Sequence, residues 1–209
     1  MPDKDFNRRG GLYRLAKFVL YVPYHMLFRI KITGRENIPR EGAVVLCANH
    51  TSMHDVPLLG LISPRQVHFV AKDEFFKGWF LRRLFLGLGA IAMNREKPTI
   101  PSLKAAVTIL KEERVMGIYL QGGRRKTIDV DEAKGGVALF AIKGRARIVP
   151  IHINAVSQFR LFSKIIINIG EPISLEEHYG ARVNAELLDG IARDVIAKIS
   201  ALGEISATP

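Results

Sequence analysis

Short apolar runs alternate with longer segments of helical periodicity over most of the chain. The apolar runs are rich in β-branched residues and predict buried strands at residues 43–48, 67–71, 90–93, 116–120, 148–153 and 164–169. The helical segments cover residues 56–62, 75–86, 100–113, 134–143 and 184–201. This alternation predicts one α/β domain, a mixed and mostly buried β-sheet with helices on both faces. The last two strands have no clear helix between them, so we expect an antiparallel or mixed edge there.

An N-terminal segment, residues 1–33, has a different pattern. Between residues 11 and 31 almost every position is apolar except for one polar stripe. Its members are three or four residues apart and share one side of a helix: Arg14, Lys17, Tyr21, His25 and Arg29. The stretch between Lys17 and Arg29 has 11 uncharged residues. A helix that spans a bilayer needs about 20 apolar residues, so this segment is too short.

We therefore expect a kinked amphipathic helix that lies in a membrane interface, followed by a catalytic domain at residues 34–209. Arg14, Lys17 and Arg29 would face anionic head groups, and Phe18 would enter the apolar layer. The alternatives are a helix packed on the domain's own core and a signal peptide, although no small-residue cleavage pattern follows the apolar run. This predicts a peripheral, monotopic protein on the cytoplasmic face of the cell membrane.

Composition supports a membrane partner over a nucleic acid. The chain has 209 residues, 48% of them hydrophobic, and a net charge of +11. The first 40 residues contain nine Lys and Arg but three acids, in an apolar context without a nucleic-acid-binding motif. We expect a phospholipid surface as partner and no nucleic acid. The lone Cys47 excludes an intrachain disulfide, and its apolar strand favours a structural thiol.

The sequence "NHTSMHD" places two histidines and an acid just after the strand predicted at residues 43–48, where α/β proteins often have active sites. His50 and His54 have the spacing of metal ligands on a helix, but no zincin glutamate accompanies them, so we expect no metal. The alternative interpretation pairs His50 as a base with Asp55 as the carboxylate that orients it. This requires His50 on the loop and Asp55 in the first helical turn, with His54 pointing elsewhere.

This motif resembles the H-x4-D signature of the glycerolipid acyltransferases, the family of PlsC-type 1-acyl-glycerol-3-phosphate acyltransferases. Three further blocks follow in the family's order: "GAIAMNR" at 89–95, "YLQGGRRK" at 119–126, which resembles F-P-E-G-T-R, and "IVPIHI" at 148–153. The resemblance implies that His50, supported by Asp55, deprotonates the sn-2 hydroxyl of lysophosphatidic acid. The alkoxide then attacks the thioester of acyl carrier protein or acyl-CoA, which gives phosphatidic acid for phospholipid biosynthesis without a cofactor or a covalent acyl-enzyme.

The resemblance also implies a site for the acceptor phosphate. Arg95 and Arg124 would hold the phosphate, because a planar guanidinium matches it in a bidentate manner, and Lys126 would add a point charge. Gly122 and Gly123 would let the backbone approach an anionic oxygen. Apart from the resemblance, the aromatic residues at 75–85 recur at helical spacing, which is typical of a core face. One face of this helix would also close an acyl channel, and its cationic residues would touch the membrane.

The third block departs from the family pattern. Leu120, Gln121 and Gly123 stand where the family has proline, glutamate and threonine. Gln121 can still form hydrogen bonds but carries no charge, so the pocket gains one unit of positive charge. Three outcomes stay open: ordinary activity, a different lysolipid or amino-lipid acceptor, and a catalytically silent membrane-binding homologue. The intact residues of the motifs argue against a silent homologue: His50, Asp55, Arg95 and Arg124.

Overall fold

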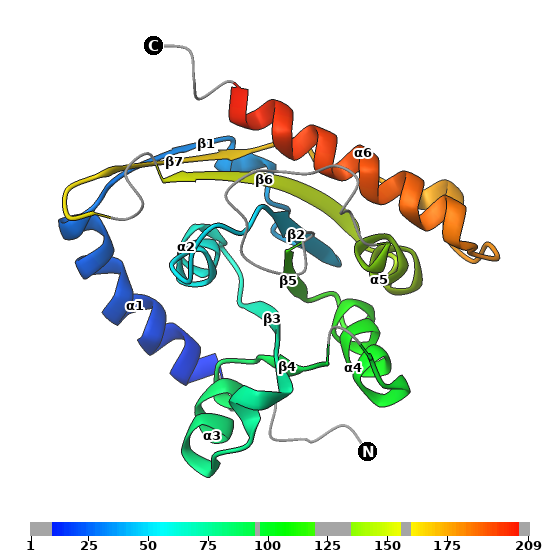
Figure 1. Ribbon diagram of the computed structural model, residues 1–209, viewed down its shortest axis with the longest axis horizontal. Helices are drawn as coiled ribbons and strands as arrows, with labels where there is room; N and C mark the ends of the chain where they lie inside the picture. Colours follow the sequence, from blue (N-terminus) through cyan, green and yellow to red (C-terminus); the bar gives the residue numbers. More distant parts are fainter. Residues whose placement is uncertain (1–9, 95–96, 120–134, 156–159, 205–209) are drawn as a thin grey trace.

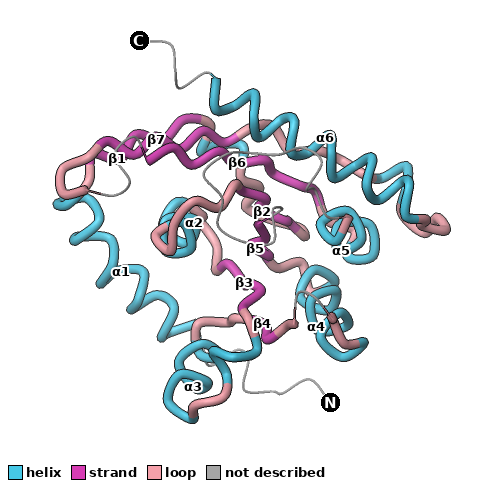
Figure 2. The backbone as a smooth tube through the Cα atoms, in the orientation of Figure 1, coloured by secondary structure: helices cyan, strands magenta, loops and turns pink. Residues whose placement is uncertain are grey.

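The computed structural model in Figures 1 and 2 describes residues 10–94, 97–119, 135–155 and 160–204. Within these residues seven strands form one sheet in the order β1-β7-β6-β2-β5-β3-β4. The strands are β1 (Arg29–Thr33), β2 (Val44–Ala48), β3 (Val67–Ala71), β4 (Ile91–Ala92), β5 (Val115–Tyr119), β6 (Arg147–Ala155) and β7 (Lys164–Ile169). The α-helices are α1 (Gly10–Leu27), α2 (Asp55–Ile62), α3 (Trp79–Gly87), α4 (Ile100–Lys111), α5 (Gly136–Gly144) and α6 (Ala185–Glu204). Short 3-10 turns are η2 (Arg35–Asn37), η3 (Asp73–Phe76) and η4 (Glu176–His178).

The predicted mixed sheet is confirmed. Strands β2 to β6 run parallel to one another, and β7 pairs antiparallel with β6, as expected for the last two strands. The sequence pattern missed β1, which pairs parallel with β7 outside it. The pattern places residues 29–33 in the N-terminal segment, but their alternating exposure is that of an edge strand. Arg29 therefore lies on a strand, and its predicted place on the helical stripe is wrong.

Helices cover both faces of the sheet, as expected (Figure 1). Alternate residues of β2 point to opposite faces because the side-chain period of a strand is two. Val45 and Cys47 belong to the core beneath α4, α5 and α6, whereas Val44 and Leu46 belong to the core beneath α1 and α2. All these side chains are fully buried. Burial raises the pKa of the Cys47 thiol, so a structural role for it fits its position.

The helix predicted at 75–86 is two elements. The η3 turn ends at Phe76 and α3 begins at Trp79. Gly78 between them has an extended conformation, φ −85° and ψ 136°, as the residue that precedes the first helical turn. Aromatic spacing continues across this break, which is why the pattern predicted one helix.

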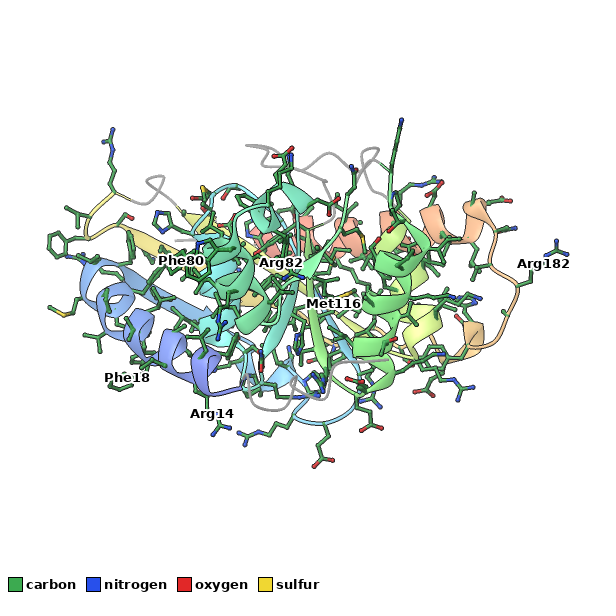
Figure 3. All side chains as sticks on the ribbon, turned by 90° about the horizontal axis from the view of Figure 1, so that it is seen from below. Arg14, Phe18, Phe80, Arg82, Met116 and Arg182 are labelled. Atoms are coloured by element: carbon green, nitrogen blue, oxygen red, sulfur yellow. The ribbon has the colours of Figure 1, made fainter. Side chains whose placement is uncertain are left out.

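Helix α1 packs on α2 through a polar and aromatic inner face. The Tyr13 hydroxyl lies 3.4 Å from the Gly60 carbonyl and accepts from the Val67 backbone N–H at 3.2 Å. The Lys17 ammonium donates to the Ser63 carbonyl at the end of α2. Lys17 therefore points inward, not toward the outer surface as the stripe predicted. Arg14 and Phe18 are exposed and project from α1 at the periphery (Figure 3).

Candidate active site

The first sequence block forms a loop at the carboxyl end of the central strand β2. The Asn49 side chain fixes this loop to β6: its Nδ2 donates to the Ile153 carbonyl at 2.9 Å, and its Oδ1 accepts from the Ile153 N–H at 2.8 Å. These two bonds satisfy both the backbone N–H and the backbone carbonyl of Ile153, near the end of β2. The loop that carries His50 is therefore held to the rigid sheet at its first residue.

His50 and Asp55 form the predicted pair. His50 Nδ1 lies 2.9 Å from Asp55 Oδ2, with His50 on the loop and Asp55 as the first residue of α2. Oδ2 also accepts from the backbone N–H groups of Thr51 and Ser52, each at 2.7 Å. Asp55 is fully buried, whereas the His50 side chain is 12% exposed. The carboxylate is thus enclosed and the imidazole reaches the surface of the site.

This hydrogen bonding defines the tautomer of His50. Asp55 Oδ2 accepts from two backbone N–H groups, so it serves as an acceptor toward the imidazole as well. His50 Nδ1 then carries the proton, and its Nε2 presents a lone pair. A neutral imidazole oriented in this way by a carboxylate can take a proton from a hydroxyl group, and the carboxylate then stabilises the imidazolium.

Tyr119, the last residue of β5, stacks on the His50 ring with centroids 4.1 Å apart and planes 18° apart. The two meet because β2 and β5 pair in register, Ala48 opposite Tyr119. Tyr119 is also the first residue of the third block, "YLQGGRRK". The first and third blocks therefore begin side by side on one edge of the sheet. Sequence reasoning did not identify Tyr119 as a contact of the histidine.

The other blocks also follow the parallel strands. The second block contains β4, which pairs with β3, and the fourth lies within β6, next to β2. Carboxyl ends of parallel strands meet at one edge, so the second block leads toward the edge that holds His50. The residues predicted to hold the phosphate lie outside the described residues: Arg95, Gln121, Gly122, Gly123, Arg124 and Lys126.

A cavity of about 660 Å³ opens beside His50. Its lining is mostly apolar, and it extends from His50 and Tyr119 between α1 and α2 to Tyr13 and Lys17. Its volume is typical of a ligand pocket, and an apolar wall with few polar groups suits an alkyl chain. Of the aromatic stripe, Phe75 and Phe85 contribute to the wall.

The rest of that stripe does not form the channel. Phe76 packs against Phe85, at a centroid distance of 5.8 Å. Trp79 and Phe80 are 78% and 63% exposed and do not line the cavity. Trp79 and Phe80 share α3 with Phe85, but at about 100° per residue they are about 120° and 140° from it around the helix, so they face another side.

His54 points away from His50, as expected. Its Nδ1 lies 2.8 Å from the Tyr24 hydroxyl of α1, and the rings of Tyr24 and Phe28 contact it edge-on. Burial, and after it the Asp55 charge, raises the pKa of Tyr24 to about 12, so the hydroxyl stays protonated. The two histidines thus bond to different partners and do not converge on a metal. Among the described side chains, no group of three or more His, Cys, Asp or Glu is placed to hold a metal ion.

Comparison with known proteins places the chain in the acyltransferase family, whose model matches residues 29–154. The chain belongs to this family, and the resemblance drawn from the four blocks is confirmed. Its relatives include three enzymes named 1-acyl-sn-glycerol-3-phosphate acyltransferase. That of Bacillus subtilis is 31% identical over 166 residues, 78% of this chain and 82% of that protein. That of Borreliella burgdorferi is 27% identical over 81% of this chain and 71% of that protein. That of Streptococcus pneumoniae is 28% identical over 77% of this chain and 60% of that protein.

A solved structure shares the fold. The 1-acyl-sn-glycerophosphate (LPA) acyltransferase PlsC from Thermotoga maritima matches with a TM-score of 0.66 and 20% sequence identity. The match covers 96% of this chain and 84% of that one. The chain therefore has the α/β fold of PlsC.

Proposed function

We propose that this chain transfers a fatty acyl group from acyl carrier protein or acyl-CoA to the sn-2 hydroxyl of lysophosphatidic acid, giving phosphatidic acid. The observation that carries the proposal is the His50–Asp55 pair, whose histidine lines an apolar cavity. The names of the relatives support the same acceptor. No metal or cofactor is needed for this transfer.

The reaction follows from the geometry of the pair. His50 Nε2 takes the proton of the acceptor hydroxyl, and Asp55 stabilises the imidazolium that results. The acceptor oxygen attacks the thioester carbonyl, the carbon–sulfur bond breaks, and the leaving thiolate takes the proton back from His50. The apolar cavity would hold the acyl chain with its reactive end beside His50. The buried Cys47 is too enclosed to serve as a nucleophile.

The acceptor phosphate would lie against Arg95, Arg124 and Lys126, with the backbone at Gly122 and Gly123 approaching an anionic oxygen. Tyr119 supports this placement, because it begins the third block and contacts His50. Gln121 in place of the family's glutamate removes one negative charge from this block. This favours an acceptor with a doubly negative phosphomonoester over a zwitterionic head group. A different lysolipid or amino-lipid acceptor is the second candidate, because the third block is altered.

An acceptor panel tests this proposal. Purified full-length chain and labelled acyl donor should acylate lysophosphatidic acid at least tenfold faster than lysophosphatidylcholine or monoacylglycerol at equal concentration. A charge-assisted contact to a phosphate contributes about 1.5–3 kcal/mol, which corresponds to about ten- to a hundredfold. Gln121→Glu should reduce the ratio of the acylation rate of lysophosphatidic acid to that of the other two acceptors. Faster acylation of a neutral or zwitterionic lysolipid would support the second candidate instead.

We also propose that the chain acts on a membrane surface. Large apolar side chains are exposed on the outer side of α1: Leu15, Phe18, Val19, Val22 and Met26. At about 100° per residue they fall within one third of the helix circumference. Trp79 and Phe80 on α3 are exposed as well. Arg82 and Arg83 belong to the same helix, and Phe80 and Arg82 are labelled in Figure 3. An exposed apolar face of this kind bordered by cations suits a lipid interface. No helix in the described ranges is long and apolar enough to cross a bilayer.

Substituting Phe18 with aspartate should weaken vesicle binding at least tenfold. Phe18 is 73% exposed, so the change removes an inserting ring without opening the core, and a buried aromatic side chain contributes about 1.5–3 kcal/mol. Co-sedimentation with vesicles of equal parts phosphatidylcholine and phosphatidylglycerol measures this. Ile100→Asp on α4 is the matched control, because Ile100 is 69% exposed and the charge change is identical. Equal losses in the two variants would refute a membrane face centred on α1.

A further inference from the structure

Helix α1 separates two cavities of opposite character. One side faces the apolar cavity beside His50, through Ala16 and Leu20. The other side faces a second cavity of about 410 Å³, through Gly10 and Arg14. Tyr13 and Lys17, on the inner face of the helix, line both cavities and form the partition between them.

The second cavity is strongly cationic. Among the described residues that line it, four are basic, Arg14, Lys17, Arg65 and Arg114, and none is acidic; His68 and Gln66 line it as well. Burial holds the pKa of His68 at about 4, so this ring stays neutral at physiological pH. The positive charge of the described lining residues is therefore concentrated in this cavity.

The surrounding contacts hold these cations in place. Arg65 Nη1 donates to the Gly42 carbonyl at 2.7 Å and its Nη2 donates to the Glu113 carbonyl, which uses two of its five N–H donors. Arg114 pairs with Glu112 at 3.1 Å. Lys17 donates to Ser63, and an ammonium has three donors. The negative charges of Glu41 and Glu113 favour the charged form of Arg65, but neither residue is among those that line the cavity.

This cavity lies away from the acyl-transfer site. It includes Val115, the first residue of β5, whereas Tyr119 at the other end of that strand stacks on His50. Four residues of strand separate the two levels by about 13 Å. The cationic cavity is therefore at the amino edge of the sheet, and the His50–Asp55 pair is at the carboxyl edge.

The orientation of Arg14 indicates the source of an anion. On the helix, Arg14 is about 40° from Phe18, at the border between the exposed apolar stripe and the cationic cavity. If the stripe lies in a lipid layer, Arg14 is at the level of the head groups and the cavity opens beside it. Arg14 and Phe18 project together from the edge of the molecule in Figure 3.

We propose that this cavity binds the phosphate group of an anionic membrane lipid, at a second site distinct from the site of acyl transfer. Arg14 and Lys17 approach the phosphate from α1, and Arg65 and Arg114 approach it from the loops that precede β3 and β5. Guanidinium groups suit a phosphate because they donate in a bidentate manner. The lipid's chains continue along the outer apolar stripe of α1. This inference rests on the proposed membrane face and not on the proposed acyl transfer.

Protection of Arg14 from phenylglyoxal tests the site in the full chain without any acyl donor. Peptide mass spectrometry would follow the modification of Arg14 and of Arg182, an exposed arginine at the far end of the molecule (Figure 3). Monomeric dihexanoyl phosphatidic acid should slow the modification of Arg14 at least fivefold and leave Arg182 unchanged. Inorganic phosphate should need about tenfold higher concentration for the same effect, because it lacks chains that contact α1.

Three variants distinguish the second site from the active site and from a general effect of charge. Arg14→Gln should weaken binding of dihexanoyl phosphatidic acid at this site about tenfold, whereas Arg182→Gln, with the same loss of charge, should not. Arg124→Gln, in the block assigned to the acceptor phosphate, should leave the protection of Arg14 unchanged. Loss of that protection in Arg124→Gln would mean one phosphate site, at the active site, and would overturn the proposal. Equal protection of Arg14 and Arg182, or equal potency of inorganic phosphate and lipid, would also overturn it.

Discussion

Replacing His50 with alanine should lower the rate of acyl transfer on the order of 10² to 10⁴. The substitution removes the only group in the proposed mechanism that takes the acceptor proton. His50 is 12% exposed and its main contacts are Asp55 and the Tyr119 ring, so the fold should persist. Steady-state kinetics with labelled donor, together with vesicle co-sedimentation to confirm unchanged membrane binding, measure the effect.

His54 offers a matched control for this substitution. It is a histidine four residues along the same loop, but its Nδ1 bonds to Tyr24 and not to Asp55. His54→Ala should therefore lower the rate less than about tenfold. It removes one hydrogen bond, which positions α1, and a single such bond contributes little. Equal losses in the two variants would show that the loop as a whole, and not the imidazole of His50, is required. Sensitivity of the wild type to chelators would point to a metal mechanism.

Replacing Asp55 with asparagine should be nearly as severe for the rate, about 10² to 10⁴. The two backbone N–H groups of Thr51 and Ser52 keep the amide oxygen in the place of Oδ2. The geometry survives, but the charge that stabilises the His50 imidazolium is lost. The amide NH2 then occupies the place of Oδ1, which is buried without a hydrogen-bond partner among the described residues. This buried donor should lower the free energy of unfolding by about 1–3 kcal/mol.

Two measurements check this second prediction. Urea unfolding gives the change in stability, and acyl-transfer kinetics give the change in rate. Asp194→Asn on α6 is the control, because Asp194 is exposed and the chemical change is the same. Asp55→Asn with a rate near that of the wild type would contradict the role of the carboxylate, whatever its stability.

The sequence was sufficient to predict the catalytic pair because its geometry is local. Only four residues lie between His50 and Asp55, and the end of a strand followed by a helix start defines their relative positions. The contacts of the same loop with Ile153 and Tyr119 were not predicted. They come from strands more than 60 residues away in sequence, and only the order of the strands in the sheet brings them together.

The N-terminal helix shows a different limit of sequence reasoning. Periodicity grouped Lys17 with Arg14 on one outward stripe. In the structure Lys17 turns inward, because the carbonyl groups at the end of α2 require donors and its ammonium supplies one. Likewise β1 was assigned to the membrane segment, because its partner β7 lies about 135 residues later and leaves no local signal. Both wrong predictions depend on which distant part of the chain packs against the segment. A local sequence pattern does not contain this information.

Identification of the product formed from lysophosphatidic acid shows whether this chain transfers an acyl group to the sn-2 hydroxyl. Purified chain is incubated with sn-1 lysophosphatidic acid and a labelled acyl thioester, and the product is analysed by mass spectrometry with positional lipase digestion. We expect phosphatidic acid labelled at the sn-2 position with the wild type and almost none with His50→Ala. Release of free fatty acid without phosphatidic acid, or equal product from the two proteins, would contradict this expectation.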